Sequence, residues 1–168
     1  MCRPREGGEM RLPSWLAALG VAVAMWLGGT GAASAQFGNC TITTTPVSFG
    51  VYNVFDASPL DSTGSIQITC FGWLRTVNVM LSKGSAPTNN PRQMVYLHPT
   101  FGESRLEYNL YLDAARSQIW GDPFPYSYST NAWWFFLNLN LTVYGRIRQQ
   151  QDVPAGSYSD LVVATINY

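Results

Sequence analysis

The last thirteen residues of the sequence constrain the fold most strongly, because their side chains alternate with a period of two. After the corner Pro154-Ala155-Gly156 and Asp160, apolar side chains occupy every second position, and Val163, Thr165 and Asn167 fill the positions between them. The apolar set is Val162, Ala164, Ile166 and Tyr168. This period is typical of a β-strand that turns one face toward a core. The printed sequence ends on this strand, so function depends on whether its sheet needs a further strand.

The same period of two recurs along most of the chain, and turn-forming residues separate the segments. No helical period is present outside residues 1–35. The predicted strands are 40–49 (broken at Pro46), 65–70 (after a turn at 62–64), 76–82, 94–97 (a short candidate), 106–113, 133–144 and 162–168. Short strands separated by turns favour an all-β immunoglobulin-like β-sandwich over a barrel. Six main strands and one short candidate predict a sandwich that is incomplete and lacks its final strand.

Aromatic residues are concentrated in an irregular segment over 114–131 and in the strand that follows it. They are Trp120, Phe124, Tyr126, Tyr128, Trp133 and Trp134. If exposed, they would form an adhesive surface, since each aromatic side chain buries a large area on contact. If packed inward, they would plug one end of the sandwich, and we favour this second interpretation.

Residues 1–35 have the features of a secretory signal peptide. An apolar run over 12–27 follows Arg11, and Ala33-Ser34-Ala35 matches the A-x-A cleavage pattern. A retained membrane anchor is the alternative, but a run of about 16 residues falls short of the roughly 20 that a spanning helix needs. We therefore expect one mature domain over 36–168, exported and without a membrane anchor.

Two cysteines remain once the predicted leader, which carries Cys2, is removed. Cys40 lies in the first predicted strand and Cys70 ends the second, each on an inward face. In an exported chain this predicts one disulfide, Cys40–Cys70. Closing a loop of about 30 residues stabilises a fold by roughly 3–4 kcal/mol.

The sequence offers no clear set of catalytic residues. The one histidine, His98, lies in a predicted turn, where a surface or capping role is typical. The carboxylate pairs Asp56/Asp61 and Glu103/Glu107 could be written as acid–base dyads, but their positions indicate solvated charges. A formal net charge of zero with a single lysine argues against a nucleic-acid binder. We expect a protein that is not an enzyme, with no cofactor, no metal and no nucleic-acid partner.

Six short motifs occur in an order that resembles a known family. They are Cys40 followed by 49–52 (Phe-Gly-Val-Tyr), 60–70 (Leu-Asp, then Gly-Ser-Ile-Gln-Ile-Thr-Cys), 106–113 (Leu-Glu-Tyr-Asn-Leu-Tyr-Leu-Asp), 119–122 (Ile-Trp-Gly-Asp), 143–147 (Val-Tyr-Gly-Arg-Ile) and 156–168 (starting Gly-Ser-Tyr-Ser-Asp). Together they span residues 40–168, and they resemble the spore coat protein U domain family. That family includes secreted coat proteins and subunits of archaic chaperone–usher pili of Gram-negative bacteria.

The resemblance implies a sandwich whose final strand comes from another polypeptide, first a periplasmic chaperone and later a neighbouring subunit. The strand over 162–168 would then border the acceptor groove. The implied function is a structural subunit of a surface pilus, fimbria or coat that also serves adhesion or biofilm formation. The implied partners are the chaperone, an outer-membrane usher and other subunits, and the implied route leads through the periplasm to the cell surface.

Other interpretations remain open. A six-stranded sandwich covered by its own loop would need no donor, as in a self-contained coat protein, and an adhesin domain would bind hydrophobic or glycan surfaces through aromatic side chains. Cleavage after Ala35 leaves four residues, 36–39, before Cys40. Four residues span at most about 14 Å, too little for a donor strand. We therefore expect a subunit that accepts a strand without donating one, at a tip or as a minor subunit.

Overall fold

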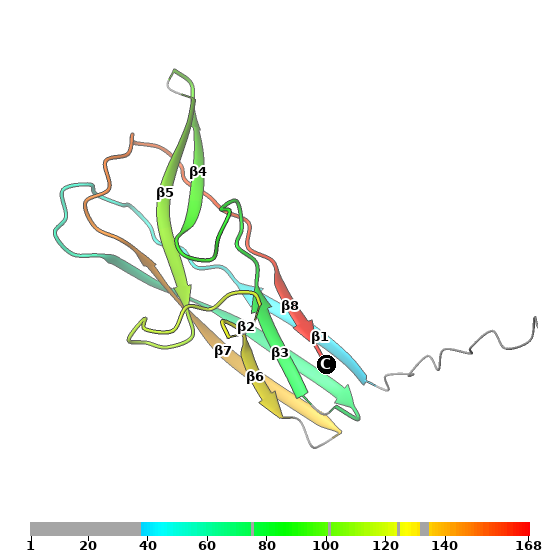
Figure 1. Ribbon diagram of the computed structural model, residues 1–168. Helices are drawn as coiled ribbons and strands as arrows, with labels where there is room; N and C mark the ends of the chain where they lie inside the picture. The colour runs from blue at the N-terminus through cyan, green and yellow to red at the C-terminus, as the bar shows by residue number, and fades with distance from the viewer. Residues whose placement is uncertain (1–37, 75, 101, 124, 132–134) are drawn as a thin grey trace, which may run out of the picture. The chain divides into compact units, whose positions relative to one another are not determined.

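The structure, a computed structural model, describes residues 38–74, 76–100, 102–123, 125–131 and 135–168 (Figure 1). The predicted leader lies outside these residues. The described residues form eight strands and no helix. The strands are β1 (Gly38–Thr45), β2 (Leu60–Gly72), β3 (Thr76–Leu81), β4 (Arg92–His98), β5 (Gly102–Tyr111), β6 (Tyr128–Asn131), β7 (Phe136–Ile147) and β8 (Ala164–Asn167). The all-β fold class is thus confirmed.

The strands build two antiparallel sheets that face each other as the layers of a sandwich (Figure 1). The larger sheet has the order β1-β2-β7-β5-β4, and the smaller has the order β6-β3-β8. Strand β1 is therefore an edge of the larger sheet, and β8 is an edge of the smaller one. This placement of the first and last strands positions the candidate site.

The core between the sheets comes from the inward positions that the alternation predicts. Ile66, Ile68 and Cys70 of β2 are buried, and so are the three inward residues of β3. Those of β3 are Val77, Val79 and Leu81. Outward neighbours such as Gln67 and Thr69 are exposed. Burying alternate side chains of a strand stabilises one register, because a slip of one residue would place polar side chains in the core.

Three strand predictions are wrong in their extent or type. Residues 62–64, predicted as a turn, lie inside β2, and the segment after Pro46 is not a strand. Tyr128–Asn131 forms β6, although the sequence predicts an irregular segment there. The short candidate strand at 94–97, by contrast, is present, and it extends over Arg92–His98 as β4. Residues 133 and 134, where the sequence predicts a strand start, lie outside the described residues.

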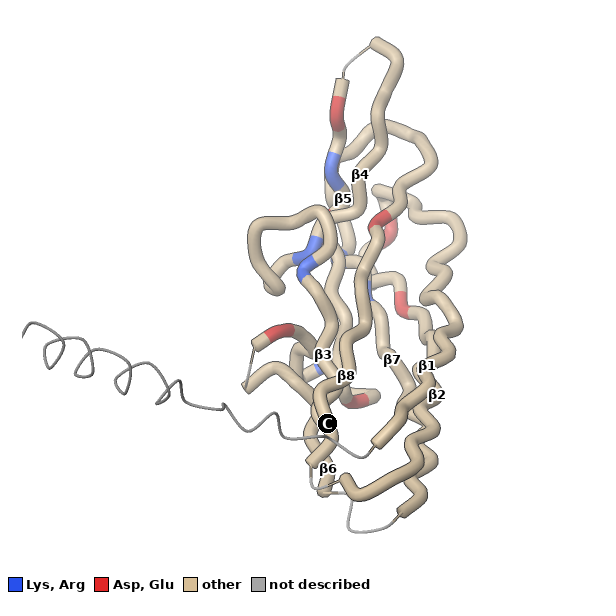
Figure 2. Tube along the Cα trace, turned by 90° about the vertical axis from the view of Figure 1, so that its right-hand side faces the viewer, with Lys and Arg blue, Asp and Glu red and all other residues tan. Residues whose placement is uncertain are grey.

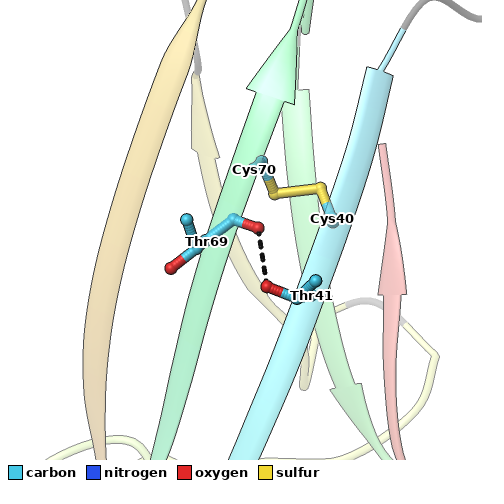
Figure 3. Close-up of a disulfide and its surroundings, with 4 residues drawn as sticks. All are labelled: Cys40, Thr41, Thr69 and Cys70. Atoms are coloured by element: carbon cyan, nitrogen blue, oxygen red, sulfur yellow. Dashed lines mark hydrogen bonds between the residues drawn. A yellow bond between two sulfur atoms is a disulfide. The ribbon is translucent and has the colours of Figure 1, made fainter.

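The predicted disulfide Cys40–Cys70 is present and joins β1 to β2 (Figure 3). The two cysteines are directly opposite each other in the strand register. On the neighbouring row the Thr41 hydroxyl donates a hydrogen bond to the Thr69 carbonyl at 3.3 Å. The disulfide therefore links β1, which pairs with a single strand among the described residues, covalently to its neighbour β2.

Candidate functional site

The site is a groove that opens between the edge strands of the two sheets. Among the described residues, β1 pairs only with β2, and β8 pairs only with β3. The two strands run in opposite directions (Figure 1), on the same side of the sandwich (Figure 2). Where β1 begins, the Tyr168 ring lies close to Gly38. Farther along the strands, toward Thr45 and Ala164, the space between the sheets opens into the groove.

The groove has a volume of about 1280 Å³, above the 300–1,000 Å³ typical of small-molecule pockets. One wall is the segment 44–54 after β1, and the other is the segment 153–162 before β8. The floor consists of apolar core side chains from four of the strands, together with Leu81. The four-strand set is Ile66, Met94, Leu106, Tyr108, Leu110, Val143 and Ile147. An apolar floor between two strand edges that have no partner among the described residues suits an extended peptide segment.

The strand edges beside the groove lack the features that normally prevent edge pairing. Neither β1 nor residues 161–168 contain a charged residue or a proline. Natural edge strands carry lysine, proline or bulges where pairing would be harmful. Ile42, although it lies on the inward face with Cys40, is 39% exposed. The core is thus left partly uncovered on this side.

The first wall is held over the larger sheet by two glycines. A Cβ atom on Gly64 would lie 2.6 Å from the Thr45 carbonyl oxygen, and one on Gly145 would lie 2.7 Å from both Phe49 and Val47. Any side chain at these positions would push the segment outward. The segment is also tied to the loop after β7, because the Gln151 amide donates to the Tyr52 hydroxyl at 2.8 Å.

The second wall crosses from one sheet to the other. Ser159 and Val95 of β4 exchange two backbone hydrogen bonds of 3.1 and 2.8 Å. Four residues later the Ser82 amide donates to the Val163 carbonyl at 2.9 Å, beside the end of β3. The chain therefore leaves the larger sheet at Ser159 and joins the smaller one as β8.

Asp160 anchors this wall at the point where it changes sheets. Its carboxylate accepts hydrogen bonds from the Tyr108 hydroxyl at 2.7 Å and from the Ser85 amide and hydroxyl, each at 2.8 Å. Burial, and then the hydrogen bond to Asp160, raise the pKa of Tyr108 well above its ordinary value. The Tyr108 hydroxyl therefore stays protonated and remains a donor at neutral pH.

Beside this anchor lies a fully buried arginine, Arg92. Its guanidinium donates to the carbonyls of Ser82, Leu81 and Trp120 and to the Asn109 side chain, over 2.6–3.3 Å. Burial lowers the pKa of Arg92 from its ordinary range. A buried cation needs such a complete set of acceptors. Because these acceptors come from the end of β3, from β5 and from the segments after them, Arg92 links the start of β4 to both strands.

The predicted groove-bordering residues Val162, Ala164, Ile166 and Tyr168 are half-buried and pack against the core. Val162 and Ala164 line the groove directly. Leu161 and Val163, on the opposite face, are exposed. The alternation of exposure thus extends over the whole predicted strand, although backbone pairing as β8 covers only Ala164–Asn167.

The described members of the candidate adhesive aromatics, Trp120, Tyr126 and Tyr128, do not form one exposed surface. Trp120 is 0% exposed, and its indole nitrogen donates to the Val79 carbonyl at 2.9 Å. It is therefore a core residue, and the adhesive alternative does not hold for it. Tyr128 packs against the core and Tyr126 is exposed. Phe124, Trp133 and Trp134 lie outside the described residues.

A different group of aromatic side chains is exposed where β2 ends and β7 begins. Phe71 and Phe136 are directly opposite each other, and the rings of Trp73 and Phe135 lie 4.1 Å apart. All four are exposed. We call Phe71, Trp73, Phe135 and Phe136 the end cluster. Its signal in the sequence is the outward position of Phe71 next to the inward Cys70.

The two carboxylate pairs considered as catalytic dyads do not act as pairs. Three of the four carboxylates contact an arginine each, and the fourth accepts a hydrogen bond from a side-chain amide. Glu103 contacts Arg105, Glu107 contacts Arg148, and Asp61 contacts Arg146 at 2.7 Å. Asp56 accepts a hydrogen bond from the Asn53 side chain. Within the described part of the chain, no group of three or more histidine, cysteine or acidic residues is placed to hold a metal ion.

His98 accepts a hydrogen bond from the Thr100 amide at 3.1 Å, as expected for a capping residue. The described residues also contain no helix long and apolar enough to cross a membrane.

Comparisons with known proteins match this architecture. The family model of the Spore Coat Protein U domain matches residues 29–165. Protein U of Myxococcus xanthus is 32% identical over 134 residues, which cover 73% of this chain and 71% of that protein. In a solved chaperone–tip adhesion subunit pre-assembly complex, CsuC–CsuE from archaic chaperone–usher Csu pili of Acinetobacter baumannii, one chain has a similar fold. It aligns with a TM-score of 0.54 and 23% identity, covering 79% of this chain but only 40% of that chain. The protein belongs to the spore coat protein U domain family.

Proposed function

We propose that this protein is a non-enzymatic structural subunit of a bacterial surface fibre, a pilus or fimbria, or of a coat. It would be assembled by insertion of a β-strand from another polypeptide. The observation that carries the proposal is the apolar groove between two unpaired, uncharged strand edges. A strand placed there would pair with β8 on one side and face β1 and the segment after it on the other. It would also cover the exposed part of the core, so affinity would come from backbone hydrogen bonds and apolar burial together.

Family membership and the fold shared with one chain of a chaperone–tip adhesion subunit complex support this proposal. The partners would be a periplasmic chaperone, an outer-membrane usher and neighbouring subunits, and the route would lead through the periplasm to the cell surface. Cleavage after Ala35 would leave only four residues, 36–39, before Cys40. The subunit would then accept a strand without donating one, at a tip or as a minor subunit.

The test is a pair of substitutions on opposite faces of the strand beside the groove. Val162 lines the groove and Val163 faces away from it. We expect Val162→Lys to abolish capture of an immobilised donor-strand peptide by the exported, oxidised protein, because it places a charge against the apolar floor. Val163→Lys adds the same charge to the exposed face and should retain capture. Equal capture by both variants, with unchanged circular dichroism, would contradict strand insertion at this groove.

A second candidate function, surface adhesion, is supported by the end cluster. The cluster has four exposed aromatic side chains at one end of β2 and β7, and the rings of two of them, Trp73 and Phe135, are in contact. Exposed apolar groups gathered in this way often mark interaction sites. We expect Trp73→Ala to weaken retention of the protein on a hydrophobic alkyl matrix, whereas Phe55→Ala, which removes an exposed ring from the loop before β2, should not. If the two substitutions reduce retention equally, adhesion does not depend on the end cluster.

A further inference from the structure

The outer face of β1, β2 and β7 carries a regular array of uncharged polar side chains. Each strand contributes to two successive rows that the register aligns across the sheet. One row is Thr41–Thr69–Asn138, and the next is Thr43–Gln67–Asn140. All six side chains are exposed. We call these six residues the polar ladder.

The polar ladder has a defined spacing and defined ends. Neighbours in a row are about 4.8 Å apart, and successive rows on one face are about 6.8 Å apart. Beyond the first row lie Phe71 and Phe136, directly opposite each other and 66% and 57% exposed. At the other end, after the row that contains Ser65, charge first appears as the ion pair Asp61–Arg146.

The array carries no charge, which is unusual for an exposed sheet face. Soluble surfaces are roughly 25–35% lysine, arginine and acidic residues. The ladder has none, and Figure 2 shows no such residue on β1 or on the neighbouring part of β2. A charged ligand such as a phosphate or an acidic polymer would find no counter-charge within the ladder.

The ladder's hydrogen-bonding groups are largely free to bind a ligand. Thr41 donates to the Thr69 carbonyl. The side chains of Gln67, Asn138 and Asn140 make no hydrogen bond to another described residue. Hydroxyl and amide groups each offer both a donor and an acceptor. They therefore complement a partner whose groups also donate and accept, as sugar hydroxyls do.

We propose that this face binds a neutral polysaccharide. The ladder would exchange hydrogen bonds with the sugar hydroxyls, and Phe71 and Phe136 would pack against the apolar faces of sugar rings, since aromatic side chains bury a large apolar area. Charge complementarity selects the occupant, because an uncharged array of donors and acceptors suits an uncharged, hydroxyl-rich polymer. None of the ladder residues lines the groove, so the site is independent of strand insertion.

The test is affinity electrophoresis of the exported, oxidised protein through gels that contain dextran, mannan or hydroxyethyl cellulose, with anionic alginate as the comparison polymer. We expect at least one neutral polymer to retard the protein and alginate not to. The double substitution Gln67→Glu with Asn140→Asp keeps the side-chain shapes and adds two charges, and it should weaken retardation at least tenfold. The double substitution Phe71→Ala with Phe136→Ala should also weaken retardation at least tenfold, whereas Phe55→Ala should leave retardation unchanged.

Control measurements on the same variants separate polymer binding from misfolding, from strand insertion and from self-association. Circular dichroism and donor-peptide capture show whether each variant is folded, and they report on strand insertion separately. The proposal is overturned if no neutral polymer retards the protein, or if the charged ladder variant is retarded as strongly as the unmodified protein. It is also overturned if sedimentation shows self-association that the ladder substitutions abolish while no polymer is bound. That result would make the face a contact between two copies of this chain.

Discussion

Asp160 determines where the last segment of the chain lies, although the sequence marks it only as the start of a strand. Its partners Ser85 and Tyr108 are 75 and 52 residues away in the chain. A Cβ atom on Gly84 would lie within 2.0 Å of the carboxylate, so the loop after β3 approaches Asp160 closely. Contacts over such separations depend on the packed sheets, and local patterns cannot predict them.

Replacing Asp160 should destabilise the domain and loosen the second wall of the groove. We expect Asp160→Ala to lower the free energy of unfolding by about 1–3 kcal/mol, because the half-buried Tyr108 hydroxyl and the Ser85 amide lose their acceptor. Asp152→Ala removes an exposed carboxylate just before this wall and should change the free energy of unfolding by less than about 0.5 kcal/mol. Urea unfolding of both variants provides the comparison, and equal stabilities would contradict the anchoring role.

Asp61 should make a small, pH-dependent contribution to stability. The hydrogen bond from Arg146 lowers the pKa of Asp61 below its ordinary value of 3.8, and desolvation opposes the shift only in part. A group with a lowered folded-state pKa stabilises the fold above its unfolded pKa and loses this contribution as pH falls through the folded pKa. Asp61→Asn should therefore cost at most about 1 kcal/mol at neutral pH, given the exposure of the pair. The cost should vanish well below pH 3.8; a cost that persists there would exclude the ion pair as its cause.

At the scale of elements, the period of two predicts the faces of the strands better than their ends. The inward residues of β2, β3 and β5 follow from alternation alone, as do those of the last strand. Alternation fails for β6, because its four residues, Tyr-Ser-Thr-Asn, contain one apolar side chain and pairing with β3 alone defines them as a strand. The prediction of a turn at 62–64 fails because serine, threonine and glycine are typical of turns. Here the glycine, Gly64, lies inside a strand and is required by the close approach of another segment.

Gly64 therefore provides a direct test at this scale. We expect Gly64→Ala to lower the free energy of unfolding by about 1–3 kcal/mol, since a methyl group 2.6 Å from the Thr45 carbonyl oxygen forces the backbone apart. Thr63→Ala, an exposed neighbour in the same strand, should cost less than about 1 kcal/mol. If Gly64→Ala is as stable as Thr63→Ala, the segment after β1 is not held against β2 at this point.

At the scale of the whole molecule, the sequence predicts an incomplete sandwich, and the structure adds the groove's dimensions and lining. The half-buried side chains of the last strand could be predicted from alternation. The wall formed by 44–54 could not, because it follows Pro46 without any strand pattern and is positioned by Gly64 and Gly145. The sequence does not predict the exposed end cluster, because aromatic residues are most concentrated over 120–134. There Trp120 is a core residue.

The measurement that tests strand acceptance most directly is chemical denaturation of the exported, oxidised protein with and without a donor peptide. The peptide should have about eight to ten residues with alternating apolar side chains, the length of an ordinary strand. A peptide of the same composition without the period of two is the control. We predict that the donor raises the free energy of unfolding by about 3–4 kcal/mol at 100–1,000 times its dissociation constant, and that the control has no effect. A protein that is already stable alone and whose unfolding is unchanged by the donor would show that the sandwich closes itself, contrary to the proposed function.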